Sequence, residues 1–460
     1  MRGADWDALR GQIAGEVILP GSPDYELARR PPIARFHDLR PTAVVRCATP
    51  ADVAATISLA RRAGLPTATR SGGHCFAGHS STTGIVIDVT PMRSVSVQGE
   101  TLTAGAGTRL GELYDALAAH GRAIPAGCGP TVGIAGLTLG GGLGILGRRH
   151  GLTCDSLLAA EVVLADGRTV RCDEHHHEEL FWALRGAGAG GFGVVTSLVF
   201  GTVPAPATTC FHLVWPHERA AALIGAWQDW APDAPDELAA SLLVTVPADL
   251  KEPPLVHVFG AMLGGEADTR KLLDELVPRV GTDPATTALE HLPFRQAKQY
   301  LADHGPGEDR PLAHLFSKSE LFARPLPEAA VAELVGTLLD GRVAGQSREL
   351  DFTPWAGAYN RVPAGATAFV HRDARFLLKQ SFMVDAGTPA SELASARRWL
   401  ERSWGAVHPW GSGGVYPNFP DPDLRDPGRA YHGANLERLR TVKRRYDPEG
   451  FFRPPQAIGG

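Results

Sequence analysis

Short apolar runs and amphipathic segments alternate along the N-terminal part of the chain. The pattern over 50–63 predicts a helix. Thr49 is a good N-cap, Asp52 completes a capping box, and Gly64 ends the apolar repeat. After it, the apolar run 84–89 is typical of a buried strand. Strands and helices therefore alternate in this part of the chain.

Three glycine-rich segments interrupt this alternation. They are 70–80 (RSGGHCFAGHS), 126–152 (AGCGPTVGIAGLTLGGGLGILGRRHGL) and 185–193 (RGAGAGGFG). The second is too rich in glycine for a regular helix and too apolar for a solvated linker. Because glycine lets a backbone approach a ligand closely, three such loops in one part of the chain predict one extended ligand.

The composition of the chain changes after about residue 203, where glycine loops become fewer and tryptophan and proline more frequent. We therefore expect three parts: a first domain over 1–205, a second domain over 206–410, and a C-terminal segment over 411–460. The last part includes a short amphipathic helix with Leu436 and Leu439 on its apolar face.

Composition and charge narrow the class of protein. The chain has 460 residues, of which 44% are hydrophobic and 21% charged, with a formal net charge of -5. It contains no run of lysine and arginine with interleaved aromatic residues, so we expect no nucleic-acid partner. It also lacks a signal-peptide pattern and any run of about 20 apolar residues, which predicts a soluble, cytoplasmic protein with no membrane partner. Oligomeric state is not predicted.

The six cysteines and the histidine run 175–177 do not predict a metal site. No two cysteines form a CxxC pair, so we expect small buried side chains and neither a disulfide scaffold nor structural zinc. Three consecutive histidines do not share one helix face.

His74 follows two glycines, which leaves two interpretations. It is either a surface residue after a tight turn or part of a loop whose backbone N–H groups bind an anion. A ligand that reaches three such loops needs a pyrophosphate between two ring systems, which favours FAD. A Rossmann site is disfavoured, because no loop gives GxGxxG between a first strand and its helix.

Four ordered motifs carry a family resemblance. They are TRSGGHCFAGHSSTTGIVIDVTPM, PTVGIAGLTLGGGLGILGRRHGL, LFWALRGAGAGGFGVVT and YHGANLERLRTVKRRYDPEGFFRPPQAI. Over nearly its whole length the chain resembles the FAD-linked oxidases of the berberine bridge enzyme-like family, especially bacterial members of the D-hydroxynicotine oxidase type. The resemblance implies an α+β fold, the two-domain vanillyl-alcohol-oxidase type FAD-binding fold with an inserted α/β substrate domain.

The resemblance also implies that His74 is bonded to the 8α-methyl carbon of the flavin, which prevents loss of the cofactor and raises its potential. The other residues expected at the cofactor are Arg70, Ser71, Gly72, Gly73, Cys75, His79, Ser80, Cys128, Thr131, Val132, Gly133, Gly136, Gly140, Gly142, Gly151, Leu152, Gly193, Val194, Val195, Tyr416 and Asn418.

Many family members form a second flavin bond from a cysteine in a Cys-Pro-Thr-(Ile/Val)-Gly loop. Here Gly129 occupies the place of that cysteine, and Cys128 comes one residue earlier. In an extended segment a shift of one residue turns the side chain to the opposite face. We therefore predict attachment through His74 alone, with a bond from Cys128 as the alternative. Val132 stands where valine is associated with access of dioxygen, so we expect an oxidase that releases hydrogen peroxide.

For the chemistry, the resemblance places a substrate-facing strand at Gln380, with Leu378 and Phe382 on the same face. This assignment depends on register, because a shift of one residue exchanges the two faces. A carboxamide is not a general base, so Tyr416, a water, or Lys379 with a lowered pKa remain as proton acceptors.

The absence of a carboxylate from that set favours a secondary-metabolite-like substrate (an amine, a phenol or a polyketide) over a sugar. Phe419 points to the same less polar pocket. We expect hydride transfer to covalently held FAD from a carbon that bears nitrogen or oxygen, with oxidative cyclisation as one possible outcome. The alternatives are an oligosaccharide oxidase with bicovalent FAD and a non-redox flavin-dependent isomerase or cyclase.

Overall fold

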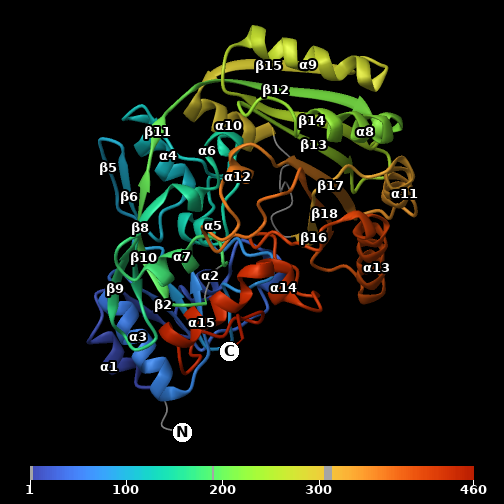
Figure 1. Cartoon of the computed structure of the whole chain (residues 1–460). Helices are drawn as coiled ribbons and strands as arrows, with labels where there is room; N and C mark the ends of the chain where they lie inside the picture. Colours follow the sequence, from blue (N-terminus) through green and yellow to red (C-terminus); the bar gives the residue numbers. More distant parts are fainter. Residues whose placement is uncertain (1–3, 189–190, 305–312, 460) are drawn as a thin grey trace.

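The computed structural model describes residues 4–188, 191–304 and 313–459, and two sheets form the first part of the fold (Figure 1). One sheet has the order β1-β2-β4-β3, with β2, β4 and β3 parallel and β1 antiparallel to β2. Its strands are β1 (Glu16–Ile18), β2 (Ala43–Arg46), β3 (Thr67–Arg70) and β4 (Ile85–Asp88).

The second sheet is antiparallel, with the order β5-β6-β10-β8-β9. Its strands are β5 (Val95–Gln98), β6 (Thr101–Gly105), β8 (Leu157–Val163), β9 (Thr169–Asp173) and β10 (Val194–Gly201), and a small separate pair joins β7 (Arg122–Ala123) to β11 (Val203–Pro204). The helices of this part are α1 (Trp6–Arg10), α2 (Tyr25–Arg29), α3 (Pro50–Ala63), α4 (Leu110–Ala118), α5 (Ile134–Leu139), α6 (Gly147–His150) and α7 (Glu178–Leu184).

Helix α3 and strand β4 confirm the local predictions. The Thr49 hydroxyl accepts from the Asp52 N–H, the Asp52 carboxylate accepts from the Thr49 N–H, and Gly64 ends the helix in the left-handed conformation with φ 66°. All four residues of β4 are buried. The belt 126–152 is less irregular than predicted, because α5 forms within it. Its segment IAGLTL contains one glycine and buries Ile134 and Leu139.

A seven-stranded antiparallel sheet forms the second part, with the order β15-β12-β14-β13-β17-β18-β16. Its strands are β12 (Ala207–Pro216), β13 (Leu238–Val246), β14 (Leu255–Met262), β15 (Thr286–Pro293), β16 (Ala313–Phe322), β17 (Ser347–Pro354) and β18 (Phe376–Asp385). Helices α8 (Ala220–Trp230), α9 (Glu266–Val280), α11 (Glu328–Leu339) and α13 (Ala390–Val407) cover its outer face in Figure 1. Two further helices, α10 (Phe294–His304) and α12 (Ala358–Arg361), lie on the side of the first part.

The two faces of this sheet differ in chemistry. Toward the helices, Leu350 and Phe382 belong to an apolar core that includes residues of α8, α9, α11 and α13. On the opposite face, which we name the open face, Glu349, Asp351 and Lys379 are partly exposed. Because strand side chains alternate, the register of each strand decides which residues the open face presents.

The C-terminal segment returns to the first part of the fold. It contains α14 (Pro427–His432) and α15 (Leu436–Tyr446), and Figure 1 shows it beside the N-terminal elements. Leu439 and Phe452 are buried in the same core cluster as the first two sheets. The predicted amphipathic helix is confirmed, with Leu439 fully buried and Leu436 packed against that core.

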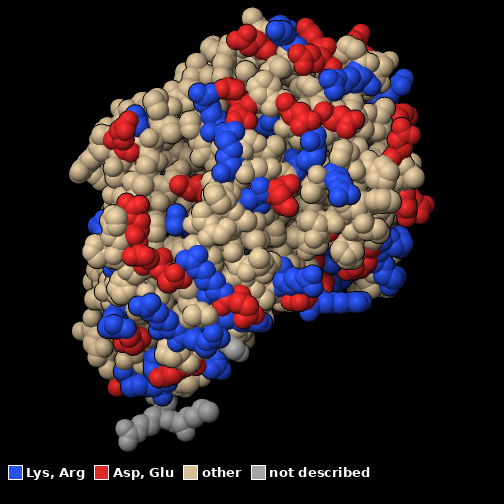
Figure 2. Space-filling view, in the orientation of Figure 1, with Lys and Arg blue, Asp and Glu red and all other residues tan. Residues whose placement is uncertain are grey.

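Acidic and basic side chains are intermixed over the face shown in Figure 2. Of the helices that the structure describes, none combines the length and the apolar character that a membrane crossing requires. All six cysteines are free thiols; four are buried, and Cys75 and Cys128 are partly exposed.

Candidate functional site

A cavity of about 430 Å³ lies where the glycine segments and the C-terminal segment meet. This volume falls within the range of about 300–1,000 Å³ that is usual for ligand and cofactor sites. Its walls come from five stretches of chain: 66–89, 132–139, 193–195, 417–420 and 452–455. Of the third glycine segment, residues 189 and 190 lie outside the described residues.

The loop 70–80 is held by close backbone packing and by one buried arginine. A Cβ atom on Gly72 would lie 2.2 Å from the backbone nitrogen of Gly133, so the two glycine segments touch backbone to backbone. The Arg70 guanidinium is buried and donates to the carbonyl oxygens of Ala28 and Ser80. Arg70 therefore fixes the loop, and it does not line the cavity.

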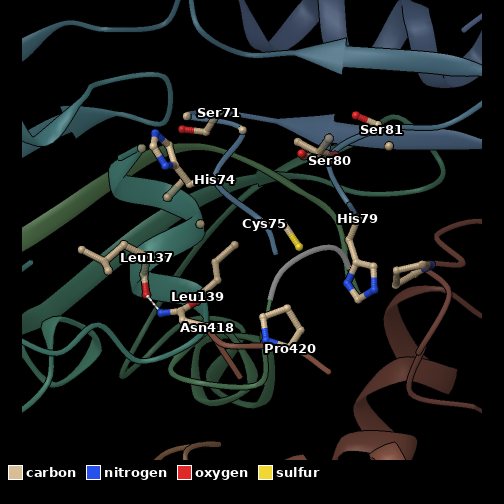
Figure 3. Close-up of a pocket in the computed structure, with 18 of the residues that line it drawn as sticks. Ser71, His74, Cys75, His79, Ser80, Ser81, Leu137, Leu139, Asn418 and Pro420 are labelled. Atoms are coloured by element: carbon tan, nitrogen blue, oxygen red, sulfur yellow. Dashed lines mark hydrogen bonds between the residues drawn. The ribbon is translucent and has the colours of Figure 1, made fainter. Parts of the chain in front are cut away.

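His74 is oriented by the second glycine segment. Its Nε2 lies 2.9 Å from the Thr131 hydroxyl. Figure 3 shows His74 at one end of the cavity and His79 at the other, with Cys75 between them. Burial lowers the pKa of His79 and raises the pKa of the Cys75 thiol, so both side chains are held in their neutral forms.

The polar groups of the cavity fit a dinucleotide such as FAD. The Ser80 hydroxyl is buried and has no hydrogen-bond partner within the described chain, which a ligand oxygen or nitrogen would supply. Asn418 donates from Nδ2 to the carbonyl of Leu137 across the cavity wall, as Figure 3 shows. Gly140 packs so closely against Asn418 that a Cβ atom there would lie 2.1 Å from its Oδ1.

The structure places many of the predicted cofactor residues at this cavity. Those that line it are Ser71, Gly72, Gly73, His74, Cys75, His79, Ser80, Val132, Gly133, Gly136, Gly193, Val195 and Asn418. Those outside its lining are Arg70, Cys128, Thr131, Gly140, Gly142, Gly151, Leu152, Val194 and Tyr416.

Tyr416 lies behind the cavity and not in its wall. It is 1% exposed, and its hydroxyl oxygen accepts from the backbone N–H groups of Gly142 (2.9 Å) and Leu143 (3.2 Å) and from the Asn418 amide. Burial raises the pKa of Tyr416 to about 12. The prediction that Tyr416 contacts the reacting groups is therefore corrected: this side chain fixes the second glycine segment.

The Cys128 sulfur faces helix α10, which follows strand β15 of the seven-stranded sheet. Lys298 of α10 donates to the sulfur over 3.8 Å and also donates to the carbonyl oxygens of Ala126 and Gly127. Lys298 is 1% exposed, with its ammonium over the ring of Tyr114. Cys128 packs against an apolar cluster, here named the interdomain cluster, that includes Leu146, Cys210 and Phe294. It is absent from the cavity lining.

Gln380 is on the wrong face for a substrate contact. It is 1% exposed, and its Oε1 accepts from the hydroxyl of Ser403 on α13 over 2.6 Å. Leu378 and Phe382, predicted to share its face, lie in the apolar core under the helices. The predicted set is therefore corrected by one residue, because the strand presents its odd-numbered side chains on the open face.

Lys379 is the member of the predicted set that reaches the open face. Its Nζ lies 3.3 Å from Glu349 Oε1, 3.3 Å from Asp351 Oδ2 and 5.4 Å from the centre of the Phe419 ring. Burial lowers the pKa of Lys379, but attraction to Glu349 and Asp351 outweighs it and raises the pKa overall. The prediction of a lowered pKa is wrong, and this ammonium is not a base.

Sequence reasoning missed Glu349, Asp351, Phe76 and Arg453. Phe76 stacks on Phe419 with ring centres 5.7 Å apart, and both rings line the cavity together with Arg453. A signal existed for the two carboxylates, because the segment ELDFT (349–353) alternates polar and apolar residues in the manner of a half-exposed strand. No local pattern indicates that Arg453 reaches the cavity.

Comparison with protein families gives two matches. A model of an FAD binding domain matches residues 41–173. A second model, described as berberine and berberine like, matches residues 415–459, the segment that closes the cavity.

Single relatives match nearly the full chain. FAD-linked oxidoreductase YgaK of Bacillus subtilis is 33% identical over 97% of both chains. Chitooligosaccharide oxidase of Gibberella zeae is 30% identical over 91% of this chain and 87% of its own. The solved structure of 6-hydroxy-D-nicotine oxidase from Arthrobacter nicotinovorans superposes with a TM-score of 0.86 and 27% identity, covering 97% of this chain and 98% of that one.

Proposed function

The chain belongs to the berberine bridge enzyme-like family of FAD-linked oxidoreductases, and from that premise we propose that His74 holds the flavin covalently while the open face of the second domain positions the substrate. The fold is of the vanillyl-alcohol-oxidase type. The observation that carries the proposal is the position of His74, in the wall of the cavity and oriented by Thr131.

The cofactor supplies the redox chemistry and the protein holds it in place. When bound, FAD would supply the chemistry of a hydride acceptor toward a carbon of the substrate, with dioxygen as the final electron acceptor and hydrogen peroxide as its product. Gly72 and Gly133 allow the two loops to meet at the cavity, and the Ser80 hydroxyl offers a hydrogen bond to the ligand. Val132 also lines this cavity, which supports dioxygen as the acceptor in the proposal.

A single flavin bond is the simpler arrangement for this chain. Cys128 contacts Lys298 and packs with the interdomain cluster, which supports attachment through His74 alone. A cysteine one residue out of place would have to leave these contacts before it could reach a ligand in the cavity.

We assign the substrate proton to the carboxylate pair, Glu349 and Asp351. Lys379 stays charged between them, and the two carboxylates are the groups that the open face offers as acceptors of a substrate proton. The preference for an amine, a phenol or a polyketide over a sugar rested on the absence of a carboxylate from the set around Gln380. Because the open face presents two, an alcohol substrate needs no other base.

The test is the intact mass of the denatured holoprotein, followed by peptide mapping. We expect an increment of the size of FAD on the peptide that contains His74 and none that bridges it to Cys128. His74→Ala should lose the increment, and the matched control His79→Ala in the same loop should keep it. A wild-type protein that is yellow but carries no increment would overturn the covalent bond.

A further inference from the structure

Cys128 and Lys298 place a thiol and an amine in contact outside the cavity. The Lys298 ammonium donates to the Cys128 sulfur over 3.8 Å, although 170 positions of chain separate the two residues. The thiol is partly exposed, whereas Lys298 is 1% exposed. Cysteines that react with oxidants are typically accessible to solvent and lie beside a cationic side chain. Cys128 meets both conditions, and the proposed function makes no use of it.

The surroundings of the other thiols are less suited to oxidation. Four of them are buried, and burial raises the pKa of each thiol: Cys47, Cys154, Cys172 and Cys210. Cys75 is partly exposed, but burial of its sulfur raises its pKa, and the sulfur accepts hydrogen bonds from backbone groups of its own loop. Cys128 is therefore the thiol that an oxidant in solution should reach and modify first.

Helix α4 holds the amine in place before any reaction. Figure 1 shows α10 beside α4, and Arg295 of α10 forms an ion pair with Asp115 of α4 over 2.6 Å. The Lys298 ammonium lies 4.9 Å from the centre of the Tyr114 ring, also on α4. Lys298 donates to two backbone carbonyl oxygens of the segment that precedes the thiol. The nitrogen is thus fixed next to the sulfur.

The backbone at the thiol has room to adjust. Gly127 and Gly129 flank Cys128, and a Cβ atom on Gly127 would have no neighbour closer than 3.7 Å. Glycine on both sides of a residue lets the chain turn with little steric cost. The sulfur can therefore approach the nitrogen without a shift of α4 or α10.

We propose that hydrogen peroxide joins Cys128 to Lys298 through a covalent sulfur–nitrogen bond, a sulfenamide. In the first step the sulfur takes one oxygen of the peroxide: the O–O bond breaks, an S–O bond forms, and the other oxygen leaves as water with the thiol proton. In the second step the Lys298 amine, after loss of a proton to solvent, attacks the sulfur. The S–N bond forms, the S–O bond breaks, and the hydroxyl leaves as water with a proton from the nitrogen.

The electron balance of this reaction needs no oxidant other than the peroxide. The sulfur loses two electrons, and one peroxide becomes two waters. Burial lowers the pKa of Lys298, which favours the neutral amine that the second step requires. Hydrogen peroxide is the expected product of the proposed function, so turnover in air supplies the oxidant. Added peroxide supplies it without turnover.

The sulfenamide would fasten the second glycine segment to α10. Thr131, three positions after Cys128, contacts His74, so the bond would connect the loop that orients this histidine to the part of the chain that forms the seven-stranded sheet. A bond between residues so distant in sequence restricts the unfolded chain, and we expect the Tm of the linked protein to rise.

The test is mass spectrometry of the full-length holoprotein after addition of hydrogen peroxide. Trypsin releases Cys128 in the peptide 123–148. We expect this peptide to be joined to one in which Lys298 is uncleaved, at a mass two hydrogen atoms below the sum of the two. Dithiothreitol should separate them, because the S–N bond is reducible. A peroxide-treated protein without this linked pair would overturn the proposal, whether Cys128 is unchanged or oxidised to a sulfinic acid.

Variants identify the two atoms that are joined. Lys298→Arg keeps the positive charge, but a guanidinium stays protonated and does not attack sulfur. We expect complete loss of the linked pair, with Cys128 now trapped by dimedone as the sulfenic acid. Cys128→Ser should also lose the linked pair with Lys298 in place, and the matched control Cys75→Ser should keep it. A linked pair that survived in Lys298→Arg would contradict the assignment of the nitrogen.

The outcome is independent of the flavin bond. A protein that carries no FAD increment on His74 and still forms the linked pair supports this proposal while the proposed function fails. An FAD increment on the peptide 123–148 would overturn it, because the flavin and not Lys298 would then hold the Cys128 sulfur.

Discussion

The cavity and the open face of the seven-stranded sheet are built by different means. At the cavity, Gly72 and Gly133 bring two backbones together, and what matters at each position is the absence of a side chain. On the open face, Lys379 and Asp351 act through their side chains, and the neighbouring Gln380 points to the opposite side. A glycine motif therefore identifies a cavity from the sequence, whereas a strand identifies a site only once its register is known.

The largest effect on stability and flavin content is expected at Gly72, where two backbones pack closely at the cavity. Gly72→Ala places a Cβ atom 2.2 Å from the Gly133 nitrogen, which neither rigid loop can avoid. We expect a loss of about 3 kcal/mol of stability, at the upper end of what overpacking costs, and a protein that retains no flavin. Visible absorbance and intact mass check this.

Gly225→Ala is the matched control for the glycine prediction. Gly225 lies within α8, and an added Cβ atom meets nothing within 4 Å. Replacing a mid-helix glycine should stabilise the protein by about 0.5–1 kcal/mol without any change in flavin content. If Gly72→Ala retained its flavin as this control does, close backbone packing would not be what forms the cavity.

The sequence predicts the local features of this molecule, but not those that depend on strand register or on contacts between distant residues. The capping box of Thr49 and Asp52 is local, and it was predicted residue by residue. The loop around His74, which its glycines predicted to approach a ligand, lines the cavity. The face of Gln380 was predicted wrongly. Strand side chains alternate with a period of two, so an error of one residue moves every side chain to the opposite face. Contacts such as Lys298 with Gly127 join residues 171 positions apart, and no local pattern encodes them.

The second prediction compares the two faces of one strand pair. Asp351→Asn removes a carboxylate from the open face, and we expect kcat to fall by about 10²–10⁴, the usual contribution of a positioned base, with little change in Tm. Gln380→Leu should do the reverse: it leaves the Ser403 hydroxyl without its acceptor, at a cost of about 1 kcal/mol, and keeps kcat.

Steady-state kinetics and thermal unfolding of both variants check this prediction. Glu349→Gln completes the set, because it shows which carboxylate of the pair takes the proton. Loss of kcat in Gln380→Leu comparable to that in Asp351→Asn would restore the original strand assignment and contradict the structure.

The third prediction concerns the stability of the fold at acidic pH. His257 on the open face hydrogen-bonds to His212 and Thr245, and burial followed by repulsion from His212 lowers its pKa to about 4. Because this pKa lies below the ordinary value near 6.5, the neutral ring stabilises the fold above pH 6.5, and that stability is lost as the pH falls toward 4. After allowance for partial exposure we expect about 2 kcal/mol.

His371 and His432, which is in the C-terminal segment, should also make the fold less stable as the pH falls. Burial lowers the pKa of both His371 and His432 to about 4. Denaturant unfolding at pH 7 and at pH 4.5 checks the sum of these effects. His257→Gln should make the free energy of unfolding less dependent on pH, because it removes the contribution of His257. If the pH dependence stayed unchanged in this variant, the acid sensitivity would be assigned to His371 and His432.

The smallest effect is expected at Lys298, which joins the two regions. Lys298→Met takes the donor from the Ala126 carbonyl, while Tyr114 still donates to the Gly127 carbonyl and a buried charge is removed. These changes partly cancel, so we expect a loss of about 1 kcal/mol. The flavin increment should stay on the His74 peptide, because the one-residue offset of Cys128 is a property of the backbone. An increment that bridged His74 and Cys128 in this variant would show instead that the Lys298 contact withholds the cysteine, and that a side chain decides the outcome even at the cofactor.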